Sequence, residues 1–198
     1  MISNPEIHYR KSIRLKGYDY SKNGIYFITI CTNNRENLFG KIATKNIIGN
    51  SVGAHCMCPE PEMILNQYGK IVEEEIIRTT EIRENILINE YVIMPNHIHM
   101  LIEIIDNKLD GKEGHMQCAP TVEKFGKSTS NSIPTIVKLL KASSTKRINI
   151  LRDAEGLPVW QRNYHENIIR TEEIYIKVSD YIRNNPLKWE DDMYFIQI

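Results

Sequence analysis

The chain has 198 residues, of which 41% are hydrophobic, and its 25 Lys and Arg residues balance 25 Asp and Glu residues. This length suits one domain with a sizeable core, so we expect a single domain over residues 1–198. Zero net charge excludes indiscriminate binding of nucleic acid through a uniformly basic surface. No apolar run approaches about 18 residues and the first residues are polar, so we expect a soluble cytoplasmic protein with no membrane partner.

Charge is nevertheless uneven along the chain. Residues 1–24 contain five basic and two acidic residues, residues 132–170 contain seven basic and three acidic residues, and residues 60–90 contain eight acidic and three basic residues. This asymmetry predicts one positive and one negative face, although helix surfaces often carry solvated charges without a partner.

The first half of the chain predicts two strands and a helix. Residues 25–32 are dense in β-branched and aromatic residues and predict a strand, followed by a short strand near residues 38–43. Gly, Cys and Pro predict an exposed loop over residues 49–62. Asn66 is a suitable N-cap for a helix to about residue 80, in which residues 73–75 face water. The apolar stripe of this helix is Tyr68, Ile71, Val72, Ile76 and Thr79.

A hairpin and a long loop follow. Residues 86–94 predict a strand that turns at Pro95-Asn96 into a second strand through residue 105. Residues 106–131 are polar, contain three glycines and predict a long loop.

Ser132 is the expected N-cap of the next helix, which has Pro134 in its first turn and runs to about Leu151. Its predicted apolar stripe is Ile136, Leu139, Leu140 and Ile148, and its basic residues on the other side are Lys138, Lys141, Lys146 and Arg147. Small and basic residues in the middle of this helix suit close approach to a phosphate backbone, and they also suit a solvated helix face.

The chain ends with a strand region and a last helix. Residues 159–169 predict the strand, and Thr171 is the expected cap of a helix from Glu172 to Asn185, which Pro186 ends. The order strand, helix, strand, strand, helix, strand, helix predicts an α+β fold in which helices pack on one antiparallel sheet.

His97 and His99 are separated by one residue in a predicted strand, so their side chains point the same way. Hydrophobic residues fill the opposite face, namely Ile98, Met100, Ile102 and Ile104. Two imidazoles at this spacing can bind one divalent ion, and they can equally be polar residues on the wet side of a half-buried strand. The strand by itself leaves both interpretations open.

Tyr181 and Asn185 are four residues apart in the last helix and therefore lie on one face. Together with the histidines, they can form a metal-assisted phosphoryl-transfer site, in which two imidazoles and an amide oxygen bind the ion and the phenol attacks. The alternative for Tyr181 is a core aromatic residue packed on Ile174 and Val178.

This combination resembles the HUH single-tyrosine transposases of the insertion-sequence-200-like group, and especially the REP-associated tyrosine transposases. The matching segments are PNHIH at 95–99, VWQRNYHENIIR at 159–170 and DYIRNNP at 180–186, supported by RKSIRLKGYDY at 10–20 and ICTNNRENLFG at 30–40. The resemblance covers most of the chain, with the loops at about 49–62 and 106–131 as unmatched insertions in a single HUH domain. The motifs are specific because they occur together and in this order.

The resemblance implies a ferredoxin-like antiparallel sheet with the catalytic tyrosine on a C-terminal helix. It implies His97 and His99 as metal ligands, Asn185 as the third ligand and Tyr181 as the nucleophile, with Mg²⁺ or Mn²⁺ as the ion. The implied function is nicking and rejoining of single-stranded DNA near a hairpin, through a 5′-phosphotyrosine intermediate. Related sequences often carry His in place of Asn167, so no auxiliary role is carried over to that position. The alternative function is a non-catalytic, domesticated binder of structured DNA or RNA on the same fold.

Single-stranded DNA with a hairpin is therefore the expected partner of a monomer or homodimer. Basic and aromatic side chains are candidates for phosphate contacts and base stacking. They are Arg14, Lys16, Lys138, Lys141, Lys146, Arg147, Trp160, Arg162 and Tyr164. Trp160 can equally be a core residue.

The two unmatched loops share a small pattern, His-x-x-Cys followed closely by Pro, in GAHCMCP at 53–59 and GHMQCAP at 114–120. A tetrahedral zinc ion bound by His55, Cys58, His115 and Cys118 would join the loops and make the protein a zinc-stabilised interaction module. The alternative is that all four cysteines of this chain are free thiols, as is usual in a cytoplasmic protein.

Overall fold

A four-stranded antiparallel sheet forms the centre of the protein, in a computed structural model that describes residues 18–44, 60–105 and 131–195. Its strands are β1 (Gly24–Cys31), β4 (Ile86–Ile93), β5 (His97–Ile104) and β6 (His165–Ile169). They lie in the order β4-β5-β1-β6, with helices α1 (Gln67–Ile82) and α2 (Ile133–Leu151) between them in the chain. This β-α-β-β-α-β arrangement is ferredoxin-like and confirms the predicted α+β fold.

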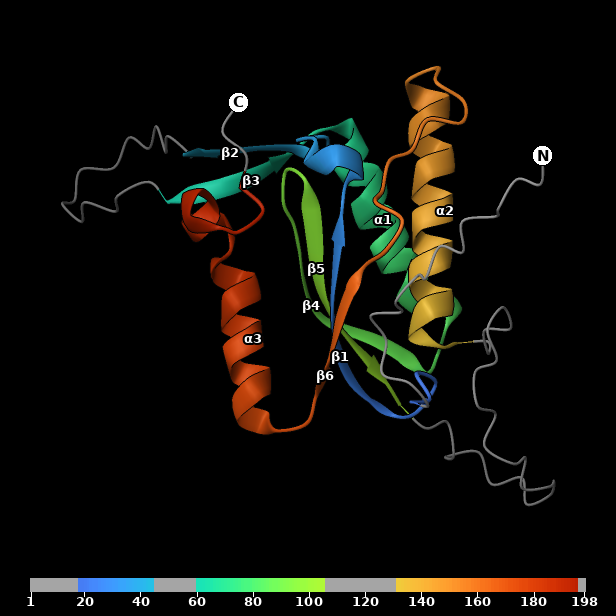
Figure 1. Cartoon of the computed structure of the whole chain (residues 1–198), viewed down its shortest axis with the longest axis vertical. Helices are drawn as coiled ribbons and strands as arrows, with labels where there is room; N and C mark the ends of the chain where they lie inside the picture. The colour runs from blue at the N-terminus through green and yellow to red at the C-terminus, as the bar shows by residue number, and fades with distance from the viewer. Residues whose placement is uncertain (1–17, 45–59, 106–130, 196–198) are drawn as a thin grey trace, which may run out of the picture.

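Helices cover both faces of this sheet (Figure 1). Helices α1 and α2 lie side by side on one face, where the main hydrophobic core contains Ile28, Ile30, Ile98 and Met100. The other face is covered by α3 (Glu172–Asn184) and the short 3-10 helix η2 (Pro186–Asp191). A smaller cluster of Leu101, Ile169 and Ile182 holds α3 against the sheet.

Between β1 and α1 the chain forms η1 (Asn33–Arg35) and a separate two-stranded sheet of β2 (Gly40–Thr44) and β3 (Pro61–Leu65). The sequence predicted β2 but not β3, because the expected loop over residues 49–62 contains the start of this strand. Gly40 has a φ of 147°, and a Cβ there would lie 2.1 Å from the Ile64 carbonyl oxygen, so the close pairing of β2 with β3 requires glycine.

Two of the three predicted helix caps form as expected. The Asn66 side chain accepts hydrogen bonds from the backbone N–H of Tyr68 (2.9 Å) and Gly69 (3.0 Å), and Thr171 accepts from Ile174 N–H (3.3 Å). Ser132 does precede α2, but its hydroxyl contacts the Thr135 hydroxyl at 3.2 Å and makes no cap bond to the backbone. The cap prediction for Ser132 is therefore right in position and wrong in mechanism.

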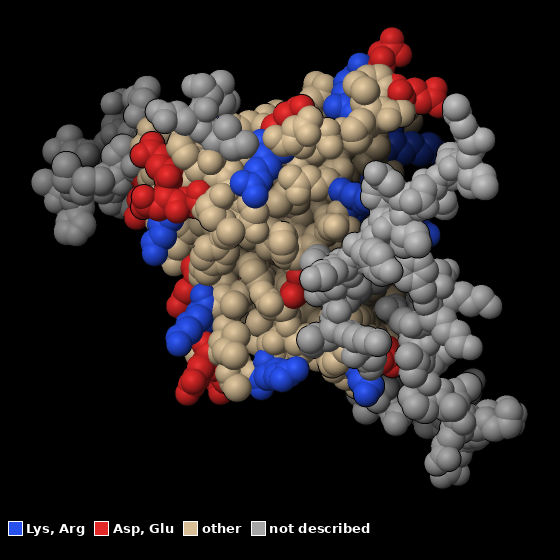
Figure 2. All heavy atoms as spheres, viewed as in Figure 1, with Lys and Arg blue, Asp and Glu red and all other residues tan. Residues whose placement is uncertain are grey.

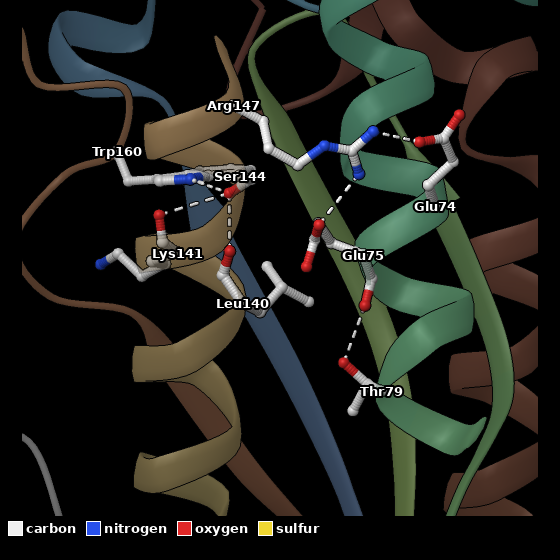
Figure 3. A network of polar contacts seen from close by, with 8 residues as sticks. All are labelled: Glu74, Glu75, Thr79, Leu140, Lys141, Ser144, Arg147 and Trp160. Atoms are coloured by element: carbon white, nitrogen blue, oxygen red, sulfur yellow. Dashed lines mark hydrogen bonds and ion pairs between the residues drawn. The ribbon is translucent and has the colours of Figure 1, made fainter. Parts of the chain in front are cut away.

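An ion-pair network joins α1 to α2 (Figure 3). The Glu75 side chain is only 5% exposed and accepts a hydrogen bond from Arg147 Nη1 at 2.9 Å, while Arg147 Nη2 pairs with Glu74. The prediction that Glu75 faces water is wrong, because α2 packs over that side of α1. Leu139 was likewise expected in the apolar stripe of α2 but is 46% exposed, and Val137 is buried in its place.

None of the helices in the described segments is long and apolar enough to cross a membrane.

Candidate metal centre and nucleophile

Side chains of β5 alternate between the two faces of the sheet, and this alternation decides where the two histidines lie. Ile98 and Met100 point into the core under α1 and α2, so His97 and His99 point to the face that α3 and η2 cover. The alternative interpretation, that these imidazoles are polar residues on the wet side of a half-buried strand, is wrong, since their exposed fractions are 0% and 1%. Their ring centroids are 4.5 Å apart. The structure thus brings the imidazoles together in a buried position beside the final helix.

Aromatic residues of the C-terminal segment cover the histidines. The ring of Tyr194 lies 4.6 Å from that of His97, and the ring of Trp189 lies 6.0 Å from it. Burial lowers the pKa of His97 to about 3, against a smaller raising effect of the Asn185 side chain. Burial, and then the neighbouring His97, lower the pKa of His99 well below its usual value. Both imidazoles are therefore neutral near pH 7, which is the form that binds metal ions.

Asn185 follows α3 and projects toward the same place. Its Nδ2 donates a hydrogen bond to Asp192 Oδ2 at 2.9 Å, which leaves Oδ1 on the other side of the amide. Within the described segments, neither Asn185 Oδ1 nor His97 Nε2 has a hydrogen-bond partner, although both atoms are buried. A buried polar atom without a partner is costly, so this pair indicates a place for a ligand.

The Tyr181 hydroxyl lies against the histidine pair. It is 3.2 Å from His99 Nε2 and donates a hydrogen bond to Asp192 Oδ2 at 3.2 Å. Burial, followed by the charge of Asp192, raises the pKa of Tyr181. The residue is 40% exposed and is not the core aromatic that the alternative interpretation required. Tyr181 is thus protonated near pH 7, and its hydroxyl would have to lose this proton to act as a nucleophile.

Asp192 is a site residue that sequence reasoning missed. One ligand atom each from His97, His99 and Asp192 lies within 4.8 Å of the others. Asp192 also accepts a hydrogen bond from Tyr194 N–H through Oδ1 at 2.7 Å. Because it comes after η2, outside the periodicity of α3, the sequence contains no spacing that links it to Tyr181.

The donor set of this centre fits a divalent ion. His97 and His99 offer nitrogen, Asn185 offers an unpaired amide oxygen, and Asp192 offers a carboxylate oxygen. Oxygen ligands suit Mg²⁺ and Mn²⁺, and imidazole favours Mn²⁺ over Mg²⁺. The arrangement therefore fits both ions that the sequence suggested.

The expected DNA-binding residues have different environments. Lys138, Lys146 and Arg162 are exposed. Trp160 is only 6% exposed, and its Nε1–H donates to Ser144 Oγ at 2.9 Å, which supports the core alternative.

The other members of this set that are described have protein partners. Lys141 Nζ donates to the backbone carbonyls of residues 161, 162 and 163, and burial lowers its pKa to about 8. Tyr164 packs against the main core, and Arg147 belongs to the network between α1 and α2. Arg14 and Lys16 lie outside the described residues.

On the face seen in Figure 2, the described Lys and Arg side chains are scattered among Asp and Glu side chains. They form no single positive patch on this face. The expected zinc ligands, His55, Cys58, His115 and Cys118, lie outside the described residues. Cys31 is a buried free thiol.

No family model matches the chain. An uncharacterised protein of Haemophilus influenzae is 38% identical over 193 residues, which cover 98% of this chain and 97% of that protein. The solved structure of a REP-associated tyrosine transposase bound to a REP hairpin matches 91% of this chain and 74% of its own, with a TM-score of 0.51 and 16% identity. A candidate transposase of Deinococcus radiodurans R1 matches 86% of this chain and 97% of its own, with a TM-score of 0.40 and 15% identity. The chain therefore belongs to the same family as the Haemophilus influenzae protein, and its fold is that of the REP-associated tyrosine transposase.

Proposed function

We propose that this protein is a metal-dependent transposase or endonuclease that nicks and rejoins single-stranded DNA near a hairpin, with Tyr181 as the nucleophile. The observation that carries the proposal is the position of the Tyr181 hydroxyl, 3.2 Å from His99 Nε2 and hydrogen-bonded to Asp192. The shared fold of a REP-associated tyrosine transposase bound to a REP hairpin supports the same activity.

In this proposal His97 Nε2, His99 Nε2, Asn185 Oδ1 and an Asp192 oxygen would hold a Mg²⁺ or Mn²⁺ ion. When bound, the ion withdraws charge from the non-bridging oxygens of the phosphate and favours the phenolate form of the nearby tyrosine. The neutral imidazoles bind without first losing a proton, because burial lowers the pKa of both.

Tyr181 and Asp192 carry the chemical step. The Tyr181 oxygen attacks the phosphorus, and its proton passes to Asp192 Oδ2, which already accepts its hydrogen bond. The new bond joins the tyrosine oxygen to phosphorus, and the bond from phosphorus to the 3′ oxygen breaks. That oxygen takes the proton from Asp192 and leaves as a free 3′ hydroxyl, while the 5′ phosphate stays on Tyr181. Attack by another 3′ hydroxyl reverses the step, so strands are rejoined without ATP.

The test is a gel assay with single-stranded hairpin oligonucleotides designed from short imperfect palindromes searched for in the DNA that flanks the gene. With Mn²⁺, the wild-type protein should give a denaturation-resistant adduct that carries label placed downstream of the cut and not upstream. Tyr181→Phe removes only the nucleophilic oxygen, so the adduct should vanish while affinity for the hairpin changes little.

Three outcomes would contradict this assignment. Cleavage by Tyr181→Phe would make Tyr175 or Tyr164 the candidate nucleophile. Cleavage by the wild type without an adduct would mean that water attacks, and binding without any cleavage would favour the non-catalytic binder.

A further inference from the structure

Asn96 is buried where the turn between β4 and β5 meets the C-terminal segment. Its exposed fraction is 0%, and its Nδ2 donates hydrogen bonds to the backbone carbonyls of Tyr194 (2.8 Å) and Arg35 (3.3 Å). Carbonyl oxygens only accept hydrogen bonds, so the amide nitrogen must face them and the amide oxygen must face away. These two contacts, to segments distant in the chain, decide the orientation of the Asn96 side chain.

The amide oxygen of Asn96 then faces His97 Nδ1 at 2.9 Å. An amide oxygen is only an acceptor, so Nδ1 must carry the proton of the neutral imidazole and Nε2 must carry the lone pair. We propose that Asn96 is a positioning residue that holds His97 in the Nδ1–H tautomer and thereby presents Nε2 to a divalent ion.

A similar argument applies to Asn185. Its Nδ2 faces a carboxylate oxygen of Asp192, so its Oδ1 faces away from Asp192 as a second buried acceptor. In the described part of the chain, no hydrogen-bond donor faces either His97 Nε2 or Asn185 Oδ1. Both atoms therefore have free lone pairs in a buried position, and a cation could bind to them. In the other tautomer His97 Nε2–H could donate to Asn185 Oδ1, and this hydrogen bond would close the site to a metal ion. Asn96 prevents that closure.

His99 has no equivalent constraint. Its Nδ1 lies 2.8 Å from Thr29 Oγ1, and its Nε2 lies 3.2 Å from the Tyr181 hydroxyl. Both partners are hydroxyls, which can donate or accept. The two histidines therefore differ in metal-free protein: the fold sets the tautomer of His97, whereas the hydroxyl partners of His99 permit either tautomer, including the one that presents Nε2 to an ion.

The inference rests on the metal site of the proposed function and not on its DNA chemistry. The direct test is a long-range ¹H–¹⁵N spectrum of metal-free wild-type protein with ¹⁵N-labelled histidine at pH 8, with the His97 signals assigned by their loss in His97→Gln. We expect a protonated Nδ1 and an unprotonated Nε2 for His97. A protonated Nε2 would overturn the proposal, and this measurement needs no variant of Asn96.

A matched pair of variants tests the consequence for metal binding, with Mn²⁺ affinity measured by calorimetry and folding by circular dichroism. Asn96→Ala removes the acceptor, so we expect His97 to adopt the Nε2–H tautomer and the Mn²⁺ affinity to fall by about 10- to 100-fold. Asn96→Asp keeps an acceptor for Nδ1–H but loses both donations to carbonyls. It should lower the melting temperature yet retain the tautomer and most of the affinity.

Wild-type Mn²⁺ affinity in a folded Asn96→Ala variant would overturn the role of Asn96, as would a wild type that binds no Mn²⁺. If the tautomer and the affinities are as expected but no DNA is cleaved, the proposed function fails and the role of Asn96 stands.

Discussion

Asp192 accepts a hydrogen bond from the Tyr181 hydroxyl and another from the Asn185 amide through the same oxygen, at 3.2 and 2.9 Å. One carboxylate therefore sets the positions of both the proposed nucleophile and a proposed metal ligand. Its other oxygen accepts the Tyr194 N–H at 2.7 Å, which prevents the group from rotating. The C-terminal segment thus contributes directly to the site.

Asp192→Asn should change the hydrogen bonds of the site while leaving the size of side chain 192 almost the same. Because Oδ1 must keep its bond to Tyr194 N–H, the new NH₂ group would face the NH₂ of Asn185 and turn that amide around. We expect Mn²⁺ affinity and the cleavage rate each to fall by about 10- to 100-fold, while hairpin affinity stays close to that of the wild type. Asp191→Asn, at the exposed neighbouring residue, is the control and should change neither quantity. Unchanged cleavage in Asp192→Asn would exclude Asp192 from the mechanism.

His97→Ala should abolish cleavage that depends on Mg²⁺ or Mn²⁺ and leave hairpin binding largely intact. The reason is that His97 Nε2 is a buried nitrogen of the candidate metal centre with no hydrogen-bond partner among the described residues, so the change removes a metal ligand and no exposed side chain. His165→Ala, at an exposed histidine of β6, is the matched control. Filter binding and the gel assay separate the two effects. Loss of cleavage and binding together, in a folded variant, would mean that the histidines serve DNA binding.

The buried histidines should make metal-free protein sensitive to mild acid. The pKa of His97 is about 3 in the folded protein, below its ordinary value of 6.5, and that of His99 is lowered in the same direction. The unfolded chain therefore binds more protons below pH 6.5, and the free energy of unfolding falls as the pH decreases from about 6.5 toward 3. The slope should reach at most about 1.4 kcal/mol per pH unit for each histidine.

Urea unfolding between pH 7.5 and 5.5 measures this slope where most carboxylates do not yet titrate. His97→Gln should lose part of the slope. An identical slope in the wild type and His97→Gln would show that His97 is not a buried neutral group.

Arg147→Met should destabilise the protein by about 1–3 kcal/mol, because the Glu75 carboxylate would remain buried without its partner. The double variant with Glu75→Gln should recover part of the loss. Lys146→Met, at the exposed neighbour on α2, should leave the unfolding free energy within about 0.5 kcal/mol of the wild type. If α2 contacts DNA, Lys146→Met should also weaken hairpin binding and make that binding less dependent on salt concentration. Equal stability of the wild type and Arg147→Met would contradict the structural role of the network in Figure 3.

The sequence by itself determined which residues share one face of a strand or helix, because this depends only on the local period of the element. The two-residue period of a strand places His97 and His99 on one face of β5, and the helical period brings Tyr181 and Asn185 together at the end of α3. The helix caps at Asn66 and Thr171 could also be predicted from the sequence, because a capping side chain bonds to backbone N–H groups only two or three residues away.

Tertiary packing decided the rest. Asn96 and the Tyr194 carbonyl are 98 residues apart, Glu75 and Arg147 are 72 apart, and Asp192 lies beyond the helix that carries Tyr181. A sequence shows which residues share a face, but not which element covers that face. The burial of the histidines, the Asp192 contact and the orientation of Asn96 arise only when α3, η2 and the C-terminal segment pack against the sheet.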